Sequence, residues 1–381
     1  MITPALRRNV TATWGEPGAR WLDALPETVA AVAGDWGLSV GAPFDLSYHY
    51  VAAATTADGE PAVLKLGVPG GGSLEEESRA LAAFGGRGAV HLLRSDLGRG
   101  ALLIERAEPG ERARDRPDAE ATAAVADAMR ALHVPVPDRP APGRAAPGRP
   151  AIAAVADAMR APHAPGPDRS APPVPGRSAL PVPGRPVPPV PERPAIAAVA
   201  DAMRAPHAPA AVAAAAPVLP DVLGQVRAFD AHLARFPGDD PLPRAFVSTA
   251  AGLMRELCAS APSRVLLHGD LHHDNLLSAR RARWLAIDPH GLSGDPGYEI
   301  GSWLFNPDPG NRDPALLALV PGRLEQFADR LGQPLDRLVA WGFVKAVLSD
   351  VWTAEHWSPG DARTPASRAL DVATLLRPRL S

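Results

Sequence analysis

The sequence predicts an α+β protein with two lobes, for three reasons. Strand-like runs separated by turn signals are concentrated between residues 37 and 106, whereas apolar residues at helical spacing dominate from 217 onward. Between these regions, residues 138–216 are dense in Pro and Ala. We therefore expect a small mixed sheet in the first lobe, a mainly helical second lobe, and an insertion without a packed core.

The elements of the first lobe follow in order. Apolar residues from 14 to 36 recur mostly every three or four positions, which predicts helices divided at Pro26. A helix over 73–84 follows a Gly-rich break, and Ser73 and an acidic first turn mark its start. Lys65 is expected in the third strand. The predicted strands are 37–41, 46–56, 61–68, 89–93 and 101–106.

The insertion contains a repeated segment. Its copies are AIAAVADAMRAPHAP at 151–165 and 195–209, and both resemble ATAAVADAMRALHVP at 121–135. Leu132 completes a helical face in the first copy, but Pro162 and Pro206 replace it later and would stop a helix. We predict one helix in the first copy and disorder of polyproline character elsewhere, with a docking tract for a Pro-binding partner as the alternative.

Domain boundaries follow from these patterns. We place a first lobe at residues 1–105 and a second lobe at 106–381, which the insertion at 138–216 interrupts. In the second lobe, apolar runs predict short strands at 265–267 and 276–277, and a third at 284–287.

Composition narrows the class of partner. The 381 residues carry a formal charge of -3, which argues against a broad basic surface for nucleic acid or anionic lipid. Cys258 is the single cysteine, so an internal disulfide and a thiolate metal cluster are excluded. No apolar run approaches the roughly 20 residues that span a bilayer. We expect a cytoplasmic protein with a small hydroxylated or cationic substrate and no obligate protein partner.

The chemistry is concentrated in HGDLHHDN, residues 268–275. If the flanking runs are strands, Asp270, Asn275 and Asp288 meet at their ends. Asn275 and Asp288 offer the oxygen ligands that Mg²⁺ prefers when a nucleotide supplies the others. Asp270 could then accept a proton from an attacking hydroxyl, at the spacing used in kinase catalytic loops.

Two other interpretations of the same stretch remain. Zinc binding is disfavoured because His272 and His273 are adjacent and would point apart, while helical zinc sites use H-x-x-x-H. Asp and Asn are also common as turn residues. His268 is expected to tie the loop to a backbone carbonyl.

The pattern H-G-D-x-x-x-x-N followed by I-D-P resembles the aminoglycoside phosphotransferase family, which has a two-lobed protein-kinase-like fold. The resemblance implies ATP and Mg²⁺ as cofactors. It also implies that residues 1–105 form the nucleotide-binding lobe and residues 106–381 the catalytic and substrate lobe. Lys65 resembles the strand lysine that contacts the nucleotide phosphates, Glu77 its ion-pair partner, and residues 102–110 the hinge between lobes. His290 stands where members tend to carry lysine.

Within that family, GARWLDALPETV, SYHYV, VLKLGVP and WGFVKAVLSDVW are most similar to the streptomycin 6-kinase and hydroxyurea kinase branch. The resemblance implies a phosphotransferase with an alcohol acceptor, which phosphorylates streptomycin at the 6-hydroxyl and inactivates it. Another small acceptor such as hydroxyurea, or a catalytically decayed nucleotide-binding protein, is the alternative.

Carboxylates of the second lobe are candidates for binding a cationic acceptor. Glu299, Asp350 and Glu355 lie on or near helices there, and negative charge at a cleft would attract guanidino or amino groups. A solvated helix face is the alternative for each. Glu299 also lies where the resemblance implies a structural acidic residue.

Overall fold

Helix α1 (Pro4–Trp36) opens the chain in the computed structural model, which describes residues 2–136, 219–355, 357 and 367–380. The Thr3 hydroxyl accepts a hydrogen bond from Leu6 N at 3.1 Å, and Gly37 ends the helix with φ 66°. The predicted division at Pro26 is wrong, because the backbone leaves helical geometry at Gly15, with φ 56° and ψ -132°. Buried side chains on both sides of Pro26 hold the helix against the sheet.

Five strands form the first sheet, in the order β1-β2-β3-β5-β4. Their bounds are β1 Ser39–Pro43, β2 Tyr50–Thr55, β3 Pro61–Leu66, β4 Leu92–Asp96 and β5 Ala101–Glu105. Every neighbouring pair is antiparallel, so the prediction of a mixed sheet is wrong in this respect. Strand β5 lies between β3 and β4, so these two strands, which run in the same direction, do not pair with each other.

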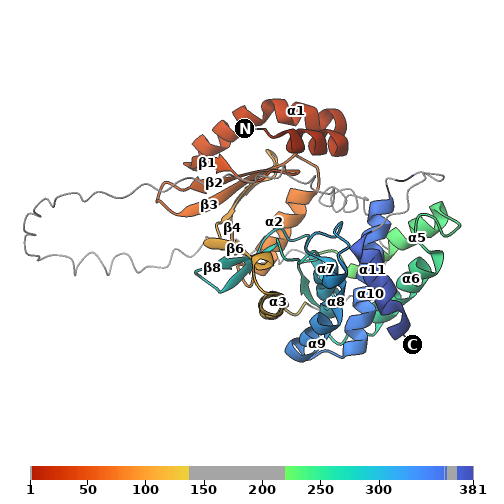
Figure 1. Ribbon diagram of the computed structural model, residues 1–381. Helices are drawn as coiled ribbons and strands as arrows, with labels where there is room; N and C mark the ends of the chain where they lie inside the picture. The colour runs from red at the N-terminus through yellow and green to blue at the C-terminus, as the bar shows by residue number, and fades with distance from the viewer. Residues whose placement is uncertain (1, 137–218, 356, 358–366, 381) are drawn as a thin grey trace, which may run out of the picture. The chain divides into compact units, whose positions relative to one another are not determined.

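Helices α1 and α2 (Ser73–Phe84) pack with different side chains of this sheet. Alternate residues of β3, Leu64 and Leu66, join the cluster formed with α1. Leu102 and Ile104 of β5 join the cluster that contains α2. Figure 1 shows α1 and α2 on different sides of the strands. The alternation places Lys65 away from α1.

Short strands carry the loop of interest. Strand β6 (Pro109–Arg112) pairs with β8 (Leu276–Ala279), which pairs with β9 (Trp284–Ala286). Strand β7 (Val265–Leu267) pairs with β10 (Leu292–Gly294). The predictions of β7, β8 and β9 are confirmed, whereas β6 and β10 were missed because their residues, PGER and LSG, form no apolar run.

Helices form the remainder of the described second lobe. Helix α10 is buried on all sides, packing against α5, α6, α7, α9 and α11. The bounds are α3 Asp118–Leu132, α5 Val226–Arg235, α6 Arg244–Ala259, α7 Gly301–Phe305, α8 Pro314–Ala318, α9 Val320–Leu331, α10 Leu335–Ala354 and α11 Arg368–Leu376. The prediction for residues 121–135 is confirmed, since Leu132 of α3 is fully buried.

Two predictions remain untested. The predicted insertion at 138–216 lies outside the described residues, and the lobe boundary at 105/106 stays a prediction. None of the helices within the described ranges has the length and apolar character needed to cross a membrane.

Candidate active site

The segment 268–275 connects β7 to β8, and buried groups fix its backbone at the start. Glu299, in the 3₁₀ helix Pro296–Ile300, accepts hydrogen bonds from His268 N at 2.6 Å and Gly269 N at 2.9 Å. The His268 ring bonds Ile287 O through Nε2 at 2.8 Å, and its Nδ1 accepts from Asp270 N at 3.3 Å. Burial lowers the pKa of His268, so the ring is neutral and Nε2 carries the proton. The predicted tie of His268 to a backbone carbonyl is confirmed.

Asp270 and Asn275 are linked across the loop. The side-chain nitrogen of Asn275 donates to Asp270 O at 3.0 Å, and Ser302 Oγ donates to Asp270 Oδ1 at 2.8 Å. Both residues are buried, with 7% exposure each. Because the Asn275 nitrogen bonds the loop, the amide oxygen is the atom that a hard cation would take.

Asp288 follows β9 and reaches the first lobe. Lys65 of β3 forms ion pairs with Asp288 and with Glu77 of α2, the latter at 2.6 Å. Asp288 has φ 63°, an uncommon conformation for a residue with a Cβ. The structure thus brings together Lys65 and Glu77, predicted to contact the nucleotide, and Asp288, predicted to bind the metal.

The Lys65 ammonium pairs with two carboxylates, and the pKa values of these two groups shift in opposite directions. Burial alone would raise the pKa of Asp288, but the Lys65 charge outweighs it and lowers the pKa to about 2. Burial raises the pKa of Glu77 to about 7, against the opposing effect of Lys65. Burial opposes the charged form of Lys65, yet Asp288 and Glu77 together raise its pKa.

Backbone hydrogen bonds join the loop at 268–275 to the segment at 287–290, which carries Asp288. Ile287 N donates to Asn275 O at 3.0 Å, and His290 N donates to His268 O at 2.9 Å. Burial lowers the pKa of His290 to about 4, while Asp270 and Asp288 both act to raise it. Both carboxylates therefore lie within electrostatic range of the His290 ring.

The donor set beside Asp288 suits a hard cation. Asp288 and Asn275 supply carboxylate and amide oxygens, the ligand types that Mg²⁺ prefers. A cavity of about 10 Å³ is lined by Asp288, Glu77 and His290 among others, and the buried Glu77 Oε1 has no hydrogen-bond partner among the residues that the structure describes. An orphaned carboxylate oxygen beside such a cavity is compatible with a bound water of a hydrated ion.

The adjacent histidines of the loop diverge, as predicted. His272 Nε2 lies 3.7 Å from Asp270 Oδ2, whereas the His273 ring stacks on Trp303 with centroids 3.6 Å apart. Two rings so directed do not share a metal ion, which argues against the zinc interpretation.

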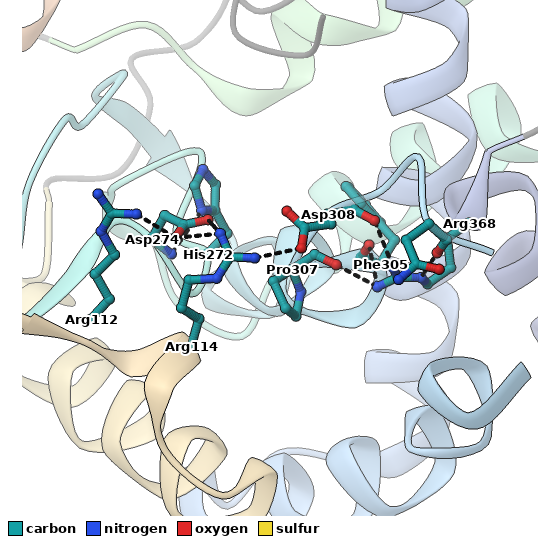
Figure 2. Close-up of polar contacts among 9 residues, drawn as sticks. Arg112, Arg114, His272, Asp274, Phe305, Pro307, Asp308 and Arg368 are labelled. Carbon is teal, nitrogen blue, oxygen red and sulfur yellow. Dashed lines mark hydrogen bonds and ion pairs between the residues drawn. The ribbon is translucent and has the colours of Figure 1, made fainter. Parts of the chain in front are cut away.

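The far end of the loop is held by arginines (Figure 2). Arg114 Nη1 lies 3.1 Å from Asp274 Oδ1, and the same guanidinium pairs with Asp308. Arg368 of α11 donates to Pro307 O and Asp308 O, each at 2.6 Å, and so anchors the segment that carries Asp308. These contacts connect the loop to the C-terminal helix.

Two of the three predicted acceptor carboxylates have other partners. Glu299 binds the loop amides and is 2% exposed, which indicates a structural role for it. Asp350 is 1% exposed and accepts from Ser367 Oγ at 2.7 Å, beside the start of α11. Glu355 is partly exposed at the end of α10, and burial raises its pKa. Burial disfavours the two former residues as first contacts for a cation.

Sequence reasoning missed Ser302 and Lys345. Ser302 contacts Asp270, and the Lys345 ammonium reaches Gly269 O at 2.7 Å. A lone lysine inside the apolar run WGFVKAVL was a signal of a buried charge, since lysine is rarely buried without a partner. Ser302 gave no such signal because its contact depends on a distant loop.

Comparisons with known proteins agree with this arrangement. The profile of the family described as aminoglycoside/hydroxyurea antibiotic resistance kinase matches residues 41–164 and 193–356. Streptomycin 6-kinase of Streptomyces glaucescens is 27% identical over 383 aligned residues, with 99% of this chain and 97% of that protein covered.

Two further relatives have related names. Hydroxyurea phosphotransferase of Kitasatospora aureofaciens is 28% identical, with 95% of this chain and 82% of that protein covered. Streptomycin 3''-kinase of Klebsiella pneumoniae is 39% identical over 113 aligned residues. That alignment covers 28% of this chain and 42% of that protein, less than half of its length.

The resemblance inferred from the loop and the flanking segments is therefore confirmed, and with it the two-lobed protein-kinase-like fold. This chain belongs to the aminoglycoside/hydroxyurea antibiotic resistance kinase family and is a phosphotransferase that acts on a hydroxyl acceptor.

Proposed function

We propose that the protein transfers the γ-phosphate of ATP to the 6-hydroxyl of streptomycin and so inactivates the antibiotic. The observation that carries the transfer is the placement of Asp270 and Asn275 on one fixed loop, joined through Ile287 to the Lys65–Asp288 ion pair. The streptomycin 6-kinase of Streptomyces glaucescens, which aligns along nearly the whole chain, supports the acceptor.

Lys65 and Glu77 form the proposed nucleotide contact. Lys65 is 4% exposed and stays charged because Asp288 and Glu77 raise its pKa. A fixed ammonium of this kind can bind phosphate oxygens and offset charge that develops during transfer. Glu77 orients the lysine by the 2.6 Å ion pair.

Asn275 and Asp288 are the proposed magnesium ligands. The depressed pKa of Asp288, about 2, keeps its carboxylate ionised at neutral pH, as cation binding requires. Asn275 and Asp288 would hold Mg²⁺ where its charge offsets part of the charge of the phosphates. Lys65 must give up part of its contact with Asp288 when nucleotide and metal enter.

Asp270 is the proposed catalytic residue. The Ser302 hydroxyl fixes its carboxylate through Oδ1, and the loop hydrogen bonds fix its backbone. A carboxylate so held can accept a hydrogen bond from the acceptor hydroxyl and take its proton as the phosphoryl group is transferred. Orientation supplies most of the effect, because this transfer asks for little covalent chemistry from the protein.

Acceptor recognition follows from charge and position. Glu355 is the partly exposed carboxylate of the predicted set, at the end of α10, and we assign it to the cationic groups of the acceptor. The reaction needs a small molecule and ATP, with no nucleic acid or membrane, and we expect it in the cytoplasm.

An acceptor panel tests the proposal. Purified protein, ATP and Mg²⁺ are incubated with streptomycin, hydroxyurea and other aminoglycosides, and product masses are measured. Phosphorylated streptomycin, absent when Mg²⁺ is chelated, is the expected result. Phosphorylation of hydroxyurea alone would move the assignment to the second acceptor, which the 28% identical hydroxyurea phosphotransferase supports. Absence of ATP turnover with every acceptor would contradict the function.

A further inference from the structure

Lys345 of α10 is a buried cation in contact with the loop that carries Asp270. It is 1% exposed, and its ammonium donates to Gly269 O at 2.7 Å and to Tyr298 Oη at 2.9 Å. The rings of Tyr298 and Trp352 lie 4.4 Å and 5.1 Å from the same nitrogen. Removing an ammonium from water is unfavourable unless such partners offset the loss. The surrounding groups therefore hold the ammonium in place against the Gly269 carbonyl.

The peptide group that Lys345 contacts lies directly before Asp270. Gly269 has φ 90°, a conformation that side chains with a Cβ rarely adopt, and a glycine at this point leaves the following peptide free to turn. The carbonyl of this peptide binds Lys345, and its N–H, that of Asp270, binds His268 Nδ1 at 3.3 Å. Opposite ends of one peptide plane are thus held by different residues.

Helix α7 leaves space for this lysine at its first residue. A Cβ built on Gly301 would lie 2.2 Å from Lys345 Cβ, so glycine at 301 lets the two helices approach closely. The next residue, Ser302, donates to the Asp270 carboxylate. At the start of α7, Gly301 therefore leaves room for Lys345 to reach the Gly269 carbonyl, and Ser302 holds the carboxylate of Asp270.

We propose that Lys345 is a positioning residue for phosphoryl transfer, which holds the peptide between Gly269 and Asp270 in the orientation that presents the Asp270 carboxylate to the acceptor hydroxyl. It acts through Gly269 and touches neither substrate nor nucleotide. The proposal rests on the proposed function, because it assigns a partner to the catalytic residue of that reaction.

Loss of the Lys345 ammonium is expected to lower kcat and to leave the affinity for the nucleotide unchanged. Loss of the ammonium allows the peptide to turn and displaces Asp270, and a displacement of about 1 Å lowers rates by up to roughly 100-fold. Lys65 and Glu77 bind each other on the first lobe, away from Gly269, so nucleotide affinity should be kept. Loss of a residue that only stabilised the fold would lower the melting temperature, but it would not lower kcat while leaving KM for ATP unchanged.

The test compares Lys345→Met, Lys345→Gln and Tyr298→Phe with the wild type. Lys345→Met should lower kcat by roughly 10- to 100-fold while KM for ATP changes by less than about threefold. Lys345→Gln keeps a donor without the charge and should recover part of kcat. Tyr298→Phe removes the hydrogen bond from Lys345 to the tyrosine hydroxyl, leaves the Gly269 contact and should change kcat by less than about threefold.

A second readout is independent of the acceptor. Amide hydrogen exchange across residues 268–275 should be faster in Lys345→Met than in the wild type, whichever molecule is phosphorylated. Unchanged exchange together with an undiminished kcat would overturn the positioning role, and so would loss of the fold in both Lys345 variants. An inactive wild type whose loop still responds to Lys345→Met would refute the proposed function, while the contact of Lys345 would still be shown to hold the loop.

Discussion

The two sides of the site are held by different kinds of contact. On the loop side, the backbone amides of His268 and Gly269 bind the buried carboxylate of Glu299, and the Gly269 carbonyl binds Lys345. On the nucleotide side, side chains from two lobes pair with one another, with Lys65 between Glu77 and Asp288.

The difference follows from what each side must do. A residue that accepts a proton benefits from a position fixed before the substrate arrives, because no reorganisation is then needed during the reaction. A residue that binds metal and nucleotide must exchange partners as they enter and leave. Ion pairs between side chains allow that exchange, whereas hydrogen bonds to buried backbone do not.

The largest effect is expected from Asp288→Asn on the exchangeable side. Loss of the carboxylate removes a metal ligand and one partner of Lys65, so Mg²⁺-dependent turnover should fall about 10³-fold, or about 4 kcal/mol of transition-state stabilisation. Steady-state kinetics at several Mg²⁺ concentrations would measure it. Wild-type turnover at saturating Mg²⁺ would remove Asp288 from the metal site.

A smaller effect is expected from Glu299→Gln on the fixed side. The neutral amide loses one acceptor for the loop N–H groups, which costs about 1–3 kcal/mol and should lower kcat by roughly 10- to 100-fold. Urea unfolding and kinetics would be measured together. The control is Glu325→Gln, an exposed position of α9, where neither quantity should change appreciably. Equal behaviour of the two variants would show that the loop does not depend on the buried carboxylate.

A pair of Gly→Ala variants tests the packing behind the loop. Gly301→Ala would force Lys345 aside and should lower the free energy of unfolding by about 1–3 kcal/mol. Gly252→Ala, in α6 with open space around the added Cβ, should be neutral or stabilising by up to about 1 kcal/mol. Thermal unfolding distinguishes them, and an equal melting temperature would contradict the close approach of α7 and α10.

Acidification should weaken the fixed side of the site. Burial lowers the pKa of His268 in the folded protein below its ordinary 6.5, so its stabilising contribution is present above that value and is lost as pH falls below it. The free energy of unfolding should therefore decline more steeply below pH 6.5 in the wild type than in His268→Asn. Parallel pH profiles from urea unfolding would contradict a neutral His268.

Much of the site was predictable because its signals are local. The apolar runs around residues 268–275 placed the strands, and the spacing from Asp270 to Asn275 placed both on one loop. The partners of Glu299 and Lys345 were not predictable, because a charge in a helix can meet solvent or a distant backbone equally well. The antiparallel order of the first sheet depends on where a hairpin inserts, which no single strand encodes.

The central claim is that Asp270, fixed on its loop, receives the acceptor proton while binding of nucleotide belongs to the other side. Asp270→Asn, which keeps the shape and removes the base, tests it most directly when ATP affinity and turnover are measured on the same preparation. We expect ATP affinity within about threefold of the wild type and turnover lowered by at least about 10²-fold. Turnover equal to that of the wild type would contradict the account.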